Sequence, residues 1–277
     1  MFTPRTPRVV AARRLHRRAE RDQQGRFLAE GPQAVREALA AGVVEELFVT
    51  GATWDRHAEL VDRAGRVSLV TDEALAVLAE TLAPQGVVAV CRQPAPSLSG
   101  VLDASPRLVV LLAGIADPGN AGTVLRTADA AGADAVLFTR ESVDPFNGKC
   151  VRASAGSLFH LPVVRGVAAD QAVAELAAAG LRVLAADPRG ECELDGYADS
   201  GALAGPLAWL FGGEAHGLPA ALAAAAHARV RVPIHGRAES LNLAAAAAVC
   251  LYASARAQRS GFSLPAPLEN TQRVDQS

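Results

Sequence analysis

Short apolar runs alternate with amphipathic or polar stretches along the first 95 residues of the chain. The apolar runs predict strands, and the stretches between them, opened by proline or by Thr71-Asp72, predict helices. The predicted strands are residues 26–30, 44–50, 67–70 and 86–92, and the predicted helices are residues 7–22, 31–42, 55–64 and 72–80. This alternation is typical of a small α/β unit.

A second series of strands and helices begins after residue 106. Leu108–Ile115 is continuously apolar, as expected for a strand in a parallel sheet that is covered on both faces. The predicted strands are residues 108–115, 135–139, 162–165, 181–187, 207–212 and 230–234, and the predicted helices are residues 121–131, 147–157, 171–179, 218–226 and 241–258. Strands that alternate with helices predict a mostly parallel sheet.

The pattern therefore predicts an α/β protein with two domains. Residues 1–95 form the first domain and residues 107–260 the second, and residues 96–106 link them after a stretch rich in proline and serine. Residues 261–277 are polar and contain two prolines, so we expect a disordered tail.

Positive charge is concentrated at the start of the chain. Residues 1–26 contain eight arginines against Glu20 and Asp22, whereas the whole chain of 277 residues has a formal net charge of −2. A basic arm on an acidic body favours a polyanionic partner, most simply nucleic acid, and a solvated helix end is the alternative.

Other features exclude several classes of protein. The four cysteines form no CxxC pair and the histidines have no metal-ligand spacing, so neither a zinc site nor a disulfide framework is expected. The sequence shows no stretch like a signal peptide and no apolar run long enough to span a membrane. We therefore expect a soluble, cytoplasmic protein with no metal and no membrane partner.

Three segments place glycine and polar residues directly after predicted strands. They are residues 117–126, 211–218 and 232–243. In an open α/β sheet, ligands bind outside the carboxyl ends of the strands. The three segments together therefore predict one composite site.

Each polar residue of these segments also has a simpler structural interpretation. Asn120 and Ser240 are both placed to cap the amino terminus of a following helix. Arg126 is placed to pair with Asp129 at i,i+3. Asn242 is harder to explain in this way, because asparagine is unfavourable inside a helix.

The glycines of the middle segment have two interpretations as well. Gly212 and Gly213 permit a ligand to approach the backbone closely, or they form an ordinary tight turn in which Glu214 suits the start of a helix. The segment is neither a dinucleotide fingerprint nor a P-loop, because it lacks both GxGxxG and Gly-Lys-Ser/Thr.

Taken together, the three segments resemble the motifs of the SpoU (TrmH) branch of the SPOUT RNA 2′-O-ribose methyltransferases. That branch carries N-x-G-x-x-x-R, G-x-E-x-x-G-L/M and I/V-P-M/I-x-G-x-x-x-S-L-N in this order. The chain matches these motifs over residues 120–126, 212–218 and 232–242, with Gly213 where many relatives have asparagine or serine. The resemblance covers residues 107–260, and residues 149–160 are similar to the family's segment between its first two motifs.

The resemblance implies a fold and partners. The second domain is expected to be a SPOUT domain with a deep trefoil knot that binds S-adenosylmethionine, and the first, through Phe27–Gly31, is similar to the family's L30e-like RNA substrate-binding domain. An obligate homodimer is implied, with each site built partly from the partner subunit. The chain is most similar to actinobacterial members that modify 23S rRNA, including thiostrepton-resistance-type enzymes.

The resemblance also implies roles for individual residues. The catalytic residues would be the polar groups of the three motifs and one arginine that reaches the partner's site, namely Asn120, Arg126, Glu214, Ser240, Asn242 and Arg152. The cofactor-binding residues would be Gly212, Gly213, Gly217, Val232, Ile234, Leu241 and Leu243. Methyl transfer from a sulfonium needs no metal.

These residue types suit a difficult nucleophile. A ribose 2′-hydroxyl needs a base, or an environment that favours the alkoxide. Arginine is normally protonated. Arg126 would therefore either act as the base with help from the RNA phosphate, or position that phosphate and stabilise developing charge.

Other functions stay open on the sequence. A tRNA 2′-O-methyltransferase and a non-catalytic RNA-binding protein of the same fold are both compatible with the motifs. A nucleotide-dependent α/β oxidoreductase is disfavoured, because the chain has no GxGxxG segment.

Overall fold

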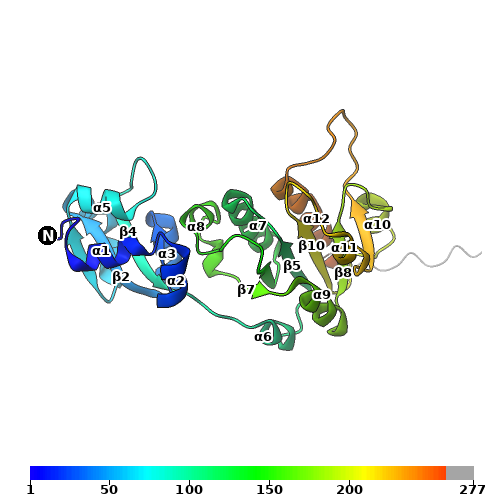
Figure 1. Cartoon of the computed structure of the whole chain (residues 1–277), viewed down its shortest axis with the longest axis horizontal. Coiled ribbons are helices and arrows are strands. Elements are labelled where there is room, and N and C mark those ends of the chain that lie inside the picture. The colour runs from blue at the N-terminus through cyan, green and yellow to red at the C-terminus, as the bar shows by residue number, and fades with distance from the viewer. Residues whose placement is uncertain (260–277) are drawn as a thin grey trace, which may run out of the picture.

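A computed structural model describes residues 1–259, and the predicted tail at 261–277 lies outside these residues. The described chain contains two separate sheets, one of four strands and one of seven. We call residues 1–92 the amino-terminal module and residues 108–259 the carboxy-terminal module. They lie side by side along the long axis of the molecule, and the chain between them runs along one edge (Figure 1).

The four-stranded sheet of the amino-terminal module has the order β1-β4-β2-β3. Its strands are β1 (Arg26–Glu30), β2 (Val44–Thr50), β3 (Val67–Val70) and β4 (Val87–Arg92). Strand β4 is antiparallel to both of its neighbours, and β2 and β3 are parallel. All four strands were predicted, and their bounds agree within one residue.

Helices and short 3₁₀ turns connect these strands. They are α1 (Pro7–Arg14), α2 (Arg18–Gln24), α3 (Pro32–Ala40), η1 (Gly51–Thr53), η2 (Asp55–His57), α4 (Ala58–Arg63) and α5 (Asp72–Leu78). Thr71 caps α5 through its side chain, as the sequence predicts. The single helix predicted over residues 7–22 is wrong, because α1 ends at Arg14 and α2 begins at Arg18.

The seven-stranded sheet of the carboxy-terminal module has the order β7-β6-β5-β10-β8-β11-β9. Its strands are β5 (Leu108–Ala113), β6 (Ala135–Thr139), β7 (Val163–Val167), β8 (Arg182–Ala186), β9 (Cys192–Glu193), β10 (Leu207–Gly212) and β11 (Ala228–Arg231). Every pairing in this sheet is parallel. The α/β class with a parallel sheet is therefore confirmed, and the trefoil knot stays a prediction.

Helices cover both faces of this sheet. They are α7 (Pro118–Ala131), α8 (Gly148–Ala153), η3 (Ser157–Phe159), α9 (Ala169–Ala178), α10 (Leu194–Asp199), α11 (Ala220–Ala224) and α12 (Leu243–Arg259). Strand β9 and helix α10 were not predicted, because both are very short. None of the helices within residues 1–259 is long and apolar enough to cross a membrane.

The segment predicted as a linker is not plain coil. It contains α6 (Leu98–Asp103), which Ser97 caps by accepting a hydrogen bond from the Gly100 amide. The predicted boundaries at residues 95 and 107 stay predictions.

Apolar side chains of both modules form one continuous core. Phe27 of β1 lies with its ring centroid 4.7 Å from that of Phe146, and it stacks on Phe159 at 6.0 Å. Phe27 belongs to the amino-terminal module and the other two rings to the carboxy-terminal module. The orientation of the two modules is therefore set by close packing rather than by the linker alone.

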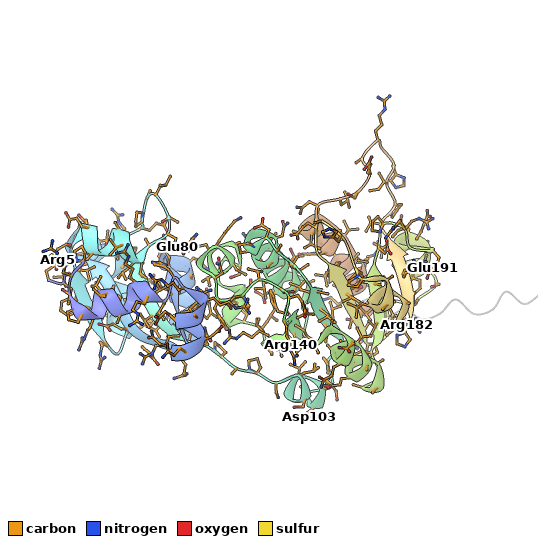
Figure 2. The ribbon with its side chains drawn as sticks, in the orientation of Figure 1. Arg5, Glu80, Asp103, Arg140, Arg182 and Glu191 are labelled. Atoms are coloured by element: carbon orange, nitrogen blue, oxygen red, sulfur yellow. The ribbon has the colours of Figure 1, made fainter. Side chains whose placement is uncertain are left out.

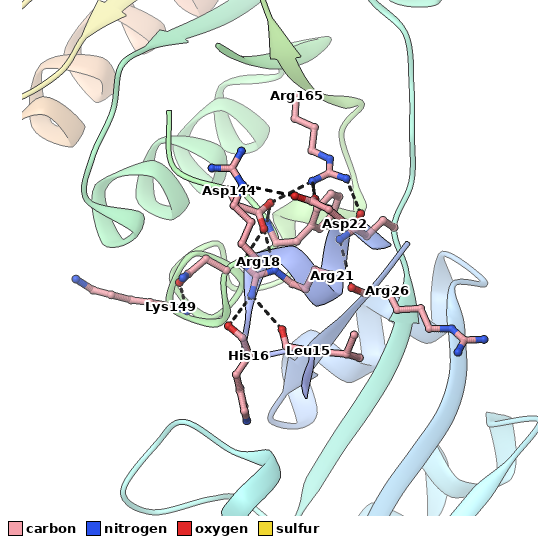
Figure 3. A network of polar contacts seen from close by, with 12 residues as sticks. Leu15, His16, Arg18, Arg21, Asp22, Arg26, Asp144, Lys149 and Arg165 are labelled. Carbon is pink, nitrogen blue, oxygen red and sulfur yellow. Dashed lines mark hydrogen bonds and ion pairs between the residues drawn. The ribbon is translucent and has the colours of Figure 1, made fainter. Parts of the chain in front are cut away.

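A buried ion pair lies at the same interface (Figure 3). Arg21 and Asp144 are each only 3% exposed, and the Arg21 Nη2 atom lies 2.7 Å from the Asp144 Oδ2 atom. Arg21 Nη1 also donates to the carbonyls of Leu15 and His16. Beside this pair, Arg165 of β7 donates to Asp22 of α2 at 2.6 Å. The two modules are thus joined both by ion pairs and by apolar packing.

Candidate active site

Three side chains from the three predicted motifs meet in one hydrogen-bonded chain. Asn120 Nδ2 donates to Glu214 Oε1 at 2.8 Å, and Asn242 Nδ2 donates to Asn120 Oδ1 at 3.2 Å. Glu214 Oε2 also accepts a hydrogen bond from the Ala116 amide at 3.4 Å. All three side chains belong to exposed or partly exposed residues, so the chain of polar groups is open to a ligand.

Sheet order brings these residues together. Strands β5 and β10 are adjacent and parallel, so Asn120 and Glu214 follow neighbouring strands at the same edge of the sheet. Asn242 arrives from the loop between β11 and α12, which extends away from the body of the module (Figure 1). Side chains from all three predicted motifs thus lie together at the carboxyl ends of the strands, where ligands bind in open α/β sheets.

Asn120 does not cap the amino terminus of its helix, so the simpler interpretation of this residue is wrong. Asp117 caps α7 by accepting from the Gly119 amide at 2.8 Å, with Pro118 in the first turn. Asn120 therefore lies inside the first turn, and its side chain is left for Glu214 and Asn242. The sequence carried the signal for this, because an aspartate directly before proline is a typical start of a helix.

Asp117 also binds the only lysine of the chain. Lys149 Nζ lies 2.7 Å from Asp117 Oδ1. The hydrogen bond from Lys149, followed by that from the Gly119 amide, lowers the pKa of the Asp117 carboxyl. This pair ties the start of α8 to the start of α7 beside the candidate site, and because the two residues are 32 positions apart no local pattern indicates it.

Asn242, and not Ser240, caps α12. The Asn242 Oδ1 atom accepts from the amide of Ala244 at 2.9 Å, so the difficulty of placing asparagine inside a helix disappears. Ser240 lies in the exposed loop before the helix. One side chain thus both caps α12 and donates to Asn120, which fixes the helix start to the site.

Arg126 does not pair with Asp129, so the i,i+3 ion pair that would have explained this arginine is wrong. Asp129 Oδ2 instead lies 2.7 Å from His160 Nδ1. Arg126 is exposed on α7, and its guanidinium has no hydrogen bond or ion pair to any residue in the described part of the chain. A permanent cation near the site is therefore available for an anionic ligand.

Arg152 lies elsewhere. Its Nη1 atom is 3.1 Å from Glu30 and 3.2 Å from Glu80, both in the amino-terminal module. Glu80 also lies 3.3 Å from His16, and the hydrogen bond to His16 lowers the pKa of Glu80 to about 2. The structure does not bring Arg152 to Asn120 and Glu214, so its role in a partner's site stays a prediction.

A cavity of about 440 Å³ lies against the hydrogen-bonded chain. Glu214 and Asn242 line it, as does Ser240. All seven predicted cofactor residues line it too: Gly212, Gly213, Gly217, Val232, Ile234, Leu241 and Leu243. Two of them are large apolar side chains that stand open, with Ile234 37% and Leu241 39% exposed. We call this space the cofactor cavity.

The glycines at the end of β10 are required by the chain itself. A Cβ atom on Gly212 would lie 2.4 Å from the carbonyl carbon of Gly217, and one on Gly213 would lie 2.4 Å from the Gly114 oxygen. The close approach that needs glycine here is therefore between two backbone segments. A larger residue at either position would disturb the loop whether or not a ligand is present.

Within residues 1–259, no group of three or more His, Cys, Asp or Glu side chains is arranged to hold a metal ion. The polar groups at the site are two side-chain amides, one carboxylate and one hydroxyl. Such a set offers hydrogen bonds to a hydroxylated ligand.

Sequence profiles of known families match most of the chain. The profile of the SpoU rRNA Methylase family matches residues 107–252, and that of the MRM3-like substrate binding domain matches residues 6–89. A 23S rRNA (guanosine(2553)-2′-O)-methyltransferase of Bacillus subtilis is 37% identical over 87% of this chain and 92% of that protein.

Solved structures give the same picture. An AdoMet-bound rRNA methyltransferase from Sinorhizobium meliloti is 34% identical, with a TM-score of 0.79 over 93% of this chain and 96% of that one. The SpoU methyltransferase AviRb from Streptomyces viridochromogenes, in complex with AdoMet, is 30% identical, with a TM-score of 0.81 over 93% of this chain and 100% of that one.

Proposed function

This chain belongs to the SpoU rRNA methylase family, and we propose that it transfers a methyl group from S-adenosylmethionine to a ribose 2′-hydroxyl of 23S rRNA. One observation carries the proposal beyond family membership. The hydrogen-bonded chain of Asn120, Glu214 and Asn242 forms part of the site beside a cavity that every predicted cofactor residue lines. A methyl donor and a hydroxyl acceptor would therefore meet at this wall.

The cofactor cavity fits S-adenosylmethionine. Ile234 and Leu241 offer apolar surface for the adenine ring, and the glycines at 212, 213 and 217 leave backbone groups accessible to polar parts of the ligand. When bound, the cofactor supplies an electrophilic methyl group on a sulfonium. The chain's own residues have to position the acceptor oxygen.

Glu214 and Asn120 would hold the ribose, because a carboxylate accepts and an amide donates hydrogen bonds to hydroxyl groups. Asn242 keeps Asn120 in place through the bond from its Nδ2 atom. The guanidinium of Arg126, which has no partner within residues 1–259, would bind the adjoining phosphate and stabilise negative charge that develops on the 2′-oxygen.

Mapping of 2′-O-methyl groups across cellular RNA, with and without this protein, tests the function. We expect one ribose of 23S rRNA to lose its methyl group when the protein is absent and to regain it when the gene is restored. A lost tRNA modification would select the alternative substrate. No change in any RNA, together with intact binding of S-adenosylmethionine, would select the non-catalytic RNA-binding protein. We also propose that the protein is cytoplasmic, where its proposed rRNA substrate would be found.

Leu241→Asp should weaken S-adenosylmethionine binding at least about tenfold, equivalent to roughly 1.4 kcal/mol. The substitution puts a carboxylate where the cavity wall is apolar, and Leu241 is 39% exposed, so the fold does not depend on its burial. Isothermal titration calorimetry measures the change. Leu82→Asp is the control, because Leu82 is fully exposed in the amino-terminal module. Equal affinities of the two variants for S-adenosylmethionine would show that the cofactor does not bind in this cavity.

We propose a homodimer that uses the exposed face of α12. Ala245, Val249 and Tyr252 follow one another at i, i+4 and i+7 on that face. Val249 is 42% and Tyr252 55% exposed, and the small residues around them permit close approach of a second helix. α12 also packs on α7, which carries Arg126, so a partner bound here would lie near the site.

Tyr252→Glu should convert the dimer into a monomer, because it buries a carboxylate in the proposed interface. Sedimentation velocity at micromolar concentration measures the oligomeric state. Val10→Glu, at a residue 46% exposed on α1, should leave the dimer intact. A wild-type monomer, or a Tyr252→Glu dimer, would refute the proposed interface.

We propose that the amino-terminal module supplies RNA affinity. Of the eight arginines in residues 1–26, Arg21 is buried and four others pair with acidic side chains: Arg8, Arg14, Arg18 and Arg26. Arg5, Arg13 and Arg17 are exposed and form no salt bridge within residues 1–259, although Arg17 acts on Glu20 electrostatically over a longer distance. Arg5 lies at the end of the molecule remote from the parallel sheet (Figure 2), which suits a role in binding rather than in chemistry.

Replacing Arg5, Arg13 and Arg17 with glutamine should reduce the slope of log K for RNA against log salt by roughly 2 to 3. Each unpaired arginine that contacts a phosphate releases about one counterion on binding. The matched control replaces Arg8, Arg14 and Arg26, which removes the same charge from side chains that already have acidic partners. Equal slopes for the two triple variants would show that this module contributes only its net charge.

A further inference from the structure

A second cavity, of about 1070 Å³, shares a wall with the cofactor cavity. Gly213, Glu214 and Gly217 line both spaces, so the loop at 213–217 separates them. Asn120 also lines the second cavity. The candidate catalytic groups therefore stand between two cavities, and the proposed cofactor accounts for only one of them.

Alanine is the most frequent residue in the walls of the second cavity. These alanines lie at the end of β5 and just after it, at the start of α9, and in and just after α11, and they include Ala113, Ala116, Ala168, Ala169, Ala221 and Ala225. We call this space the alanine cavity. Small apolar walls leave room for a flat ring and cover its faces without offering it hydrogen bonds.

Polar groups stand around this apolar space. Arg140, Glu141, Asp170 and His216 line the cavity. Arg140 donates through its Nε atom to the Gly166 carbonyl at 3.2 Å, and Figure 2 labels this residue near β7. The side chains of Glu141, Asp170 and His216 make no hydrogen bond or ion pair with the described residues. Apolar walls with unused donors and acceptors match a nucleobase, which has apolar faces and a polar edge.

We propose that the alanine cavity binds the base of the nucleotide whose 2′-hydroxyl is methylated. The inference rests on the proposed function. In a nucleotide, the carbon that carries the 2′-hydroxyl is bonded to the carbon that carries the base. A ribose whose 2′-hydroxyl lies at Asn120 and Glu214 therefore places its base beside the same loop, and the alanine cavity is the space on that side that the cofactor does not fill.

The position of Arg126 agrees with this arrangement. Arg126 is six residues after Asn120 on α7, about 9 Å further along the helix axis, and it does not line the alanine cavity. A phosphate held by Arg126 and a base held in the cavity would thus leave the ribose in different directions. Entry of the base requires an unpaired or extruded nucleotide, as for other enzymes that enclose a base.

Filling the cavity tests the proposal. Ala221→Trp adds an indole on the exposed surface of α11 that lines the cavity. Ala224→Trp is the matched control, because Ala224 is exposed on the same helix and does not line the cavity. Both variants and the wild type are assayed on one short RNA that contains the mapped target, made either with its natural base or with an abasic ribose that keeps the 2′-hydroxyl.

On natural RNA, Ala221→Trp should lower kcat/KM at least about tenfold, an effect of roughly 1.4 kcal/mol, and Ala224→Trp should not. On abasic RNA, the wild type should fall to a similar level and Ala221→Trp should cause no further loss, because the base that it excludes is absent. S-adenosylmethionine affinity should be the same for all three proteins.

Three results would overturn the proposal. The first is normal activity of Ala221→Trp on natural RNA. The second is a fall in kcat/KM of Ala221→Trp, relative to the wild type, that is equally large on natural and on abasic RNA. The third is a loss of S-adenosylmethionine affinity in Ala221→Trp alone. Failure of the proposed function looks different, because the wild type itself would then transfer no methyl group to any RNA.

Discussion

Arg126→Ala should lower the single-turnover rate of methyl transfer at least about 100-fold, as expected when a group that acts on the reacting oxygen is removed. Affinity for S-adenosylmethionine and the thermal midpoint should stay unchanged. Arg126 is exposed, lacks a partner in residues 1–259 and does not line the cofactor cavity. Its removal therefore breaks no contact that stabilises the fold.

Arg182→Ala is the matched control for this experiment. Arg182 is an exposed arginine at the amino end of β8, at the opposite edge of the sheet from the site, and its Nη1 atom donates to the Ala202 carbonyl at 3.1 Å. Its removal changes the net charge equally and should leave the rate unchanged. A near-normal rate for Arg126→Ala would show that this arginine has no part in the chemistry, whatever the family resemblance implies.

A lysine at position 126 addresses the role of the arginine. Lysine keeps the positive charge and binds phosphate as a point charge, whereas arginine binds it through two parallel hydrogen bonds. If Arg126 only attracts the phosphate, Arg126→Lys should recover much of the rate at low salt. If it acts as a base, the rate of the lysine variant should rise with pH as the amine loses its proton, since lysine ordinarily titrates near about 10.4.

Arg21→Met should lower the free energy of unfolding by about 3–5 kcal/mol, the usual cost of leaving one member of a buried ion pair without its partner. Asp144 is 3% exposed and would lose its closest cation, keeping only Arg165 at 3.7 Å, and the carbonyls of Leu15 and His16 would lose a donor. Urea denaturation followed by circular dichroism measures the change.

Arg18→Met is the control for Arg21→Met. Arg18 lies one turn earlier on the same helix, and its guanidinium is exposed, 3.7 Å from Asp22. An exposed pair of this kind contributes about 0–1 kcal/mol. The double variant Arg21→Met/Asp144→Asn should recover part of the lost stability, because it leaves no buried charge without a partner. A cost below about 1 kcal/mol for Arg21→Met would show that water reaches this interface.

The same substitution bears on target choice. Arg21 belongs to the amino-terminal module and Asp144 to the carboxy-terminal module, so their pair helps to fix where bound RNA meets the site (Figure 3). A module that reads RNA at a fixed distance from the site selects one nucleotide. Among correctly folded variants, loss of this pair should therefore affect the choice of nucleotide more than cofactor affinity.

Local sequence was enough to predict most of the secondary structure and the residues that gather at the site. Strands such as Val44–Thr50 and Leu207–Gly212 were predicted at their observed bounds, because apolar runs and turn residues act over a few positions. The motif residues were found because each follows the carboxyl end of a strand, and parallel strands end at one edge of a sheet.

Tertiary structure decided how those residues are used. Asn120 bonds Glu214 across 94 positions of sequence and Asn242 across 122, and no local pattern encodes such a pairing. Within residues 1–259 Arg126 has no partner, and Asp129, which local spacing had offered to it, instead bonds His160, 31 positions away.

Sequence counting alone also misjudged the basic arm. Arg21 is one of eight arginines in residues 1–26, and by composition it is part of a charged surface. In the fold it is buried against Asp144, 123 positions away. Composition and periodicity report interactions within a few residues of one another, whereas the partner of a side chain depends on strand order and module packing. Those are set by contacts between distant segments, which only the folded chain reveals.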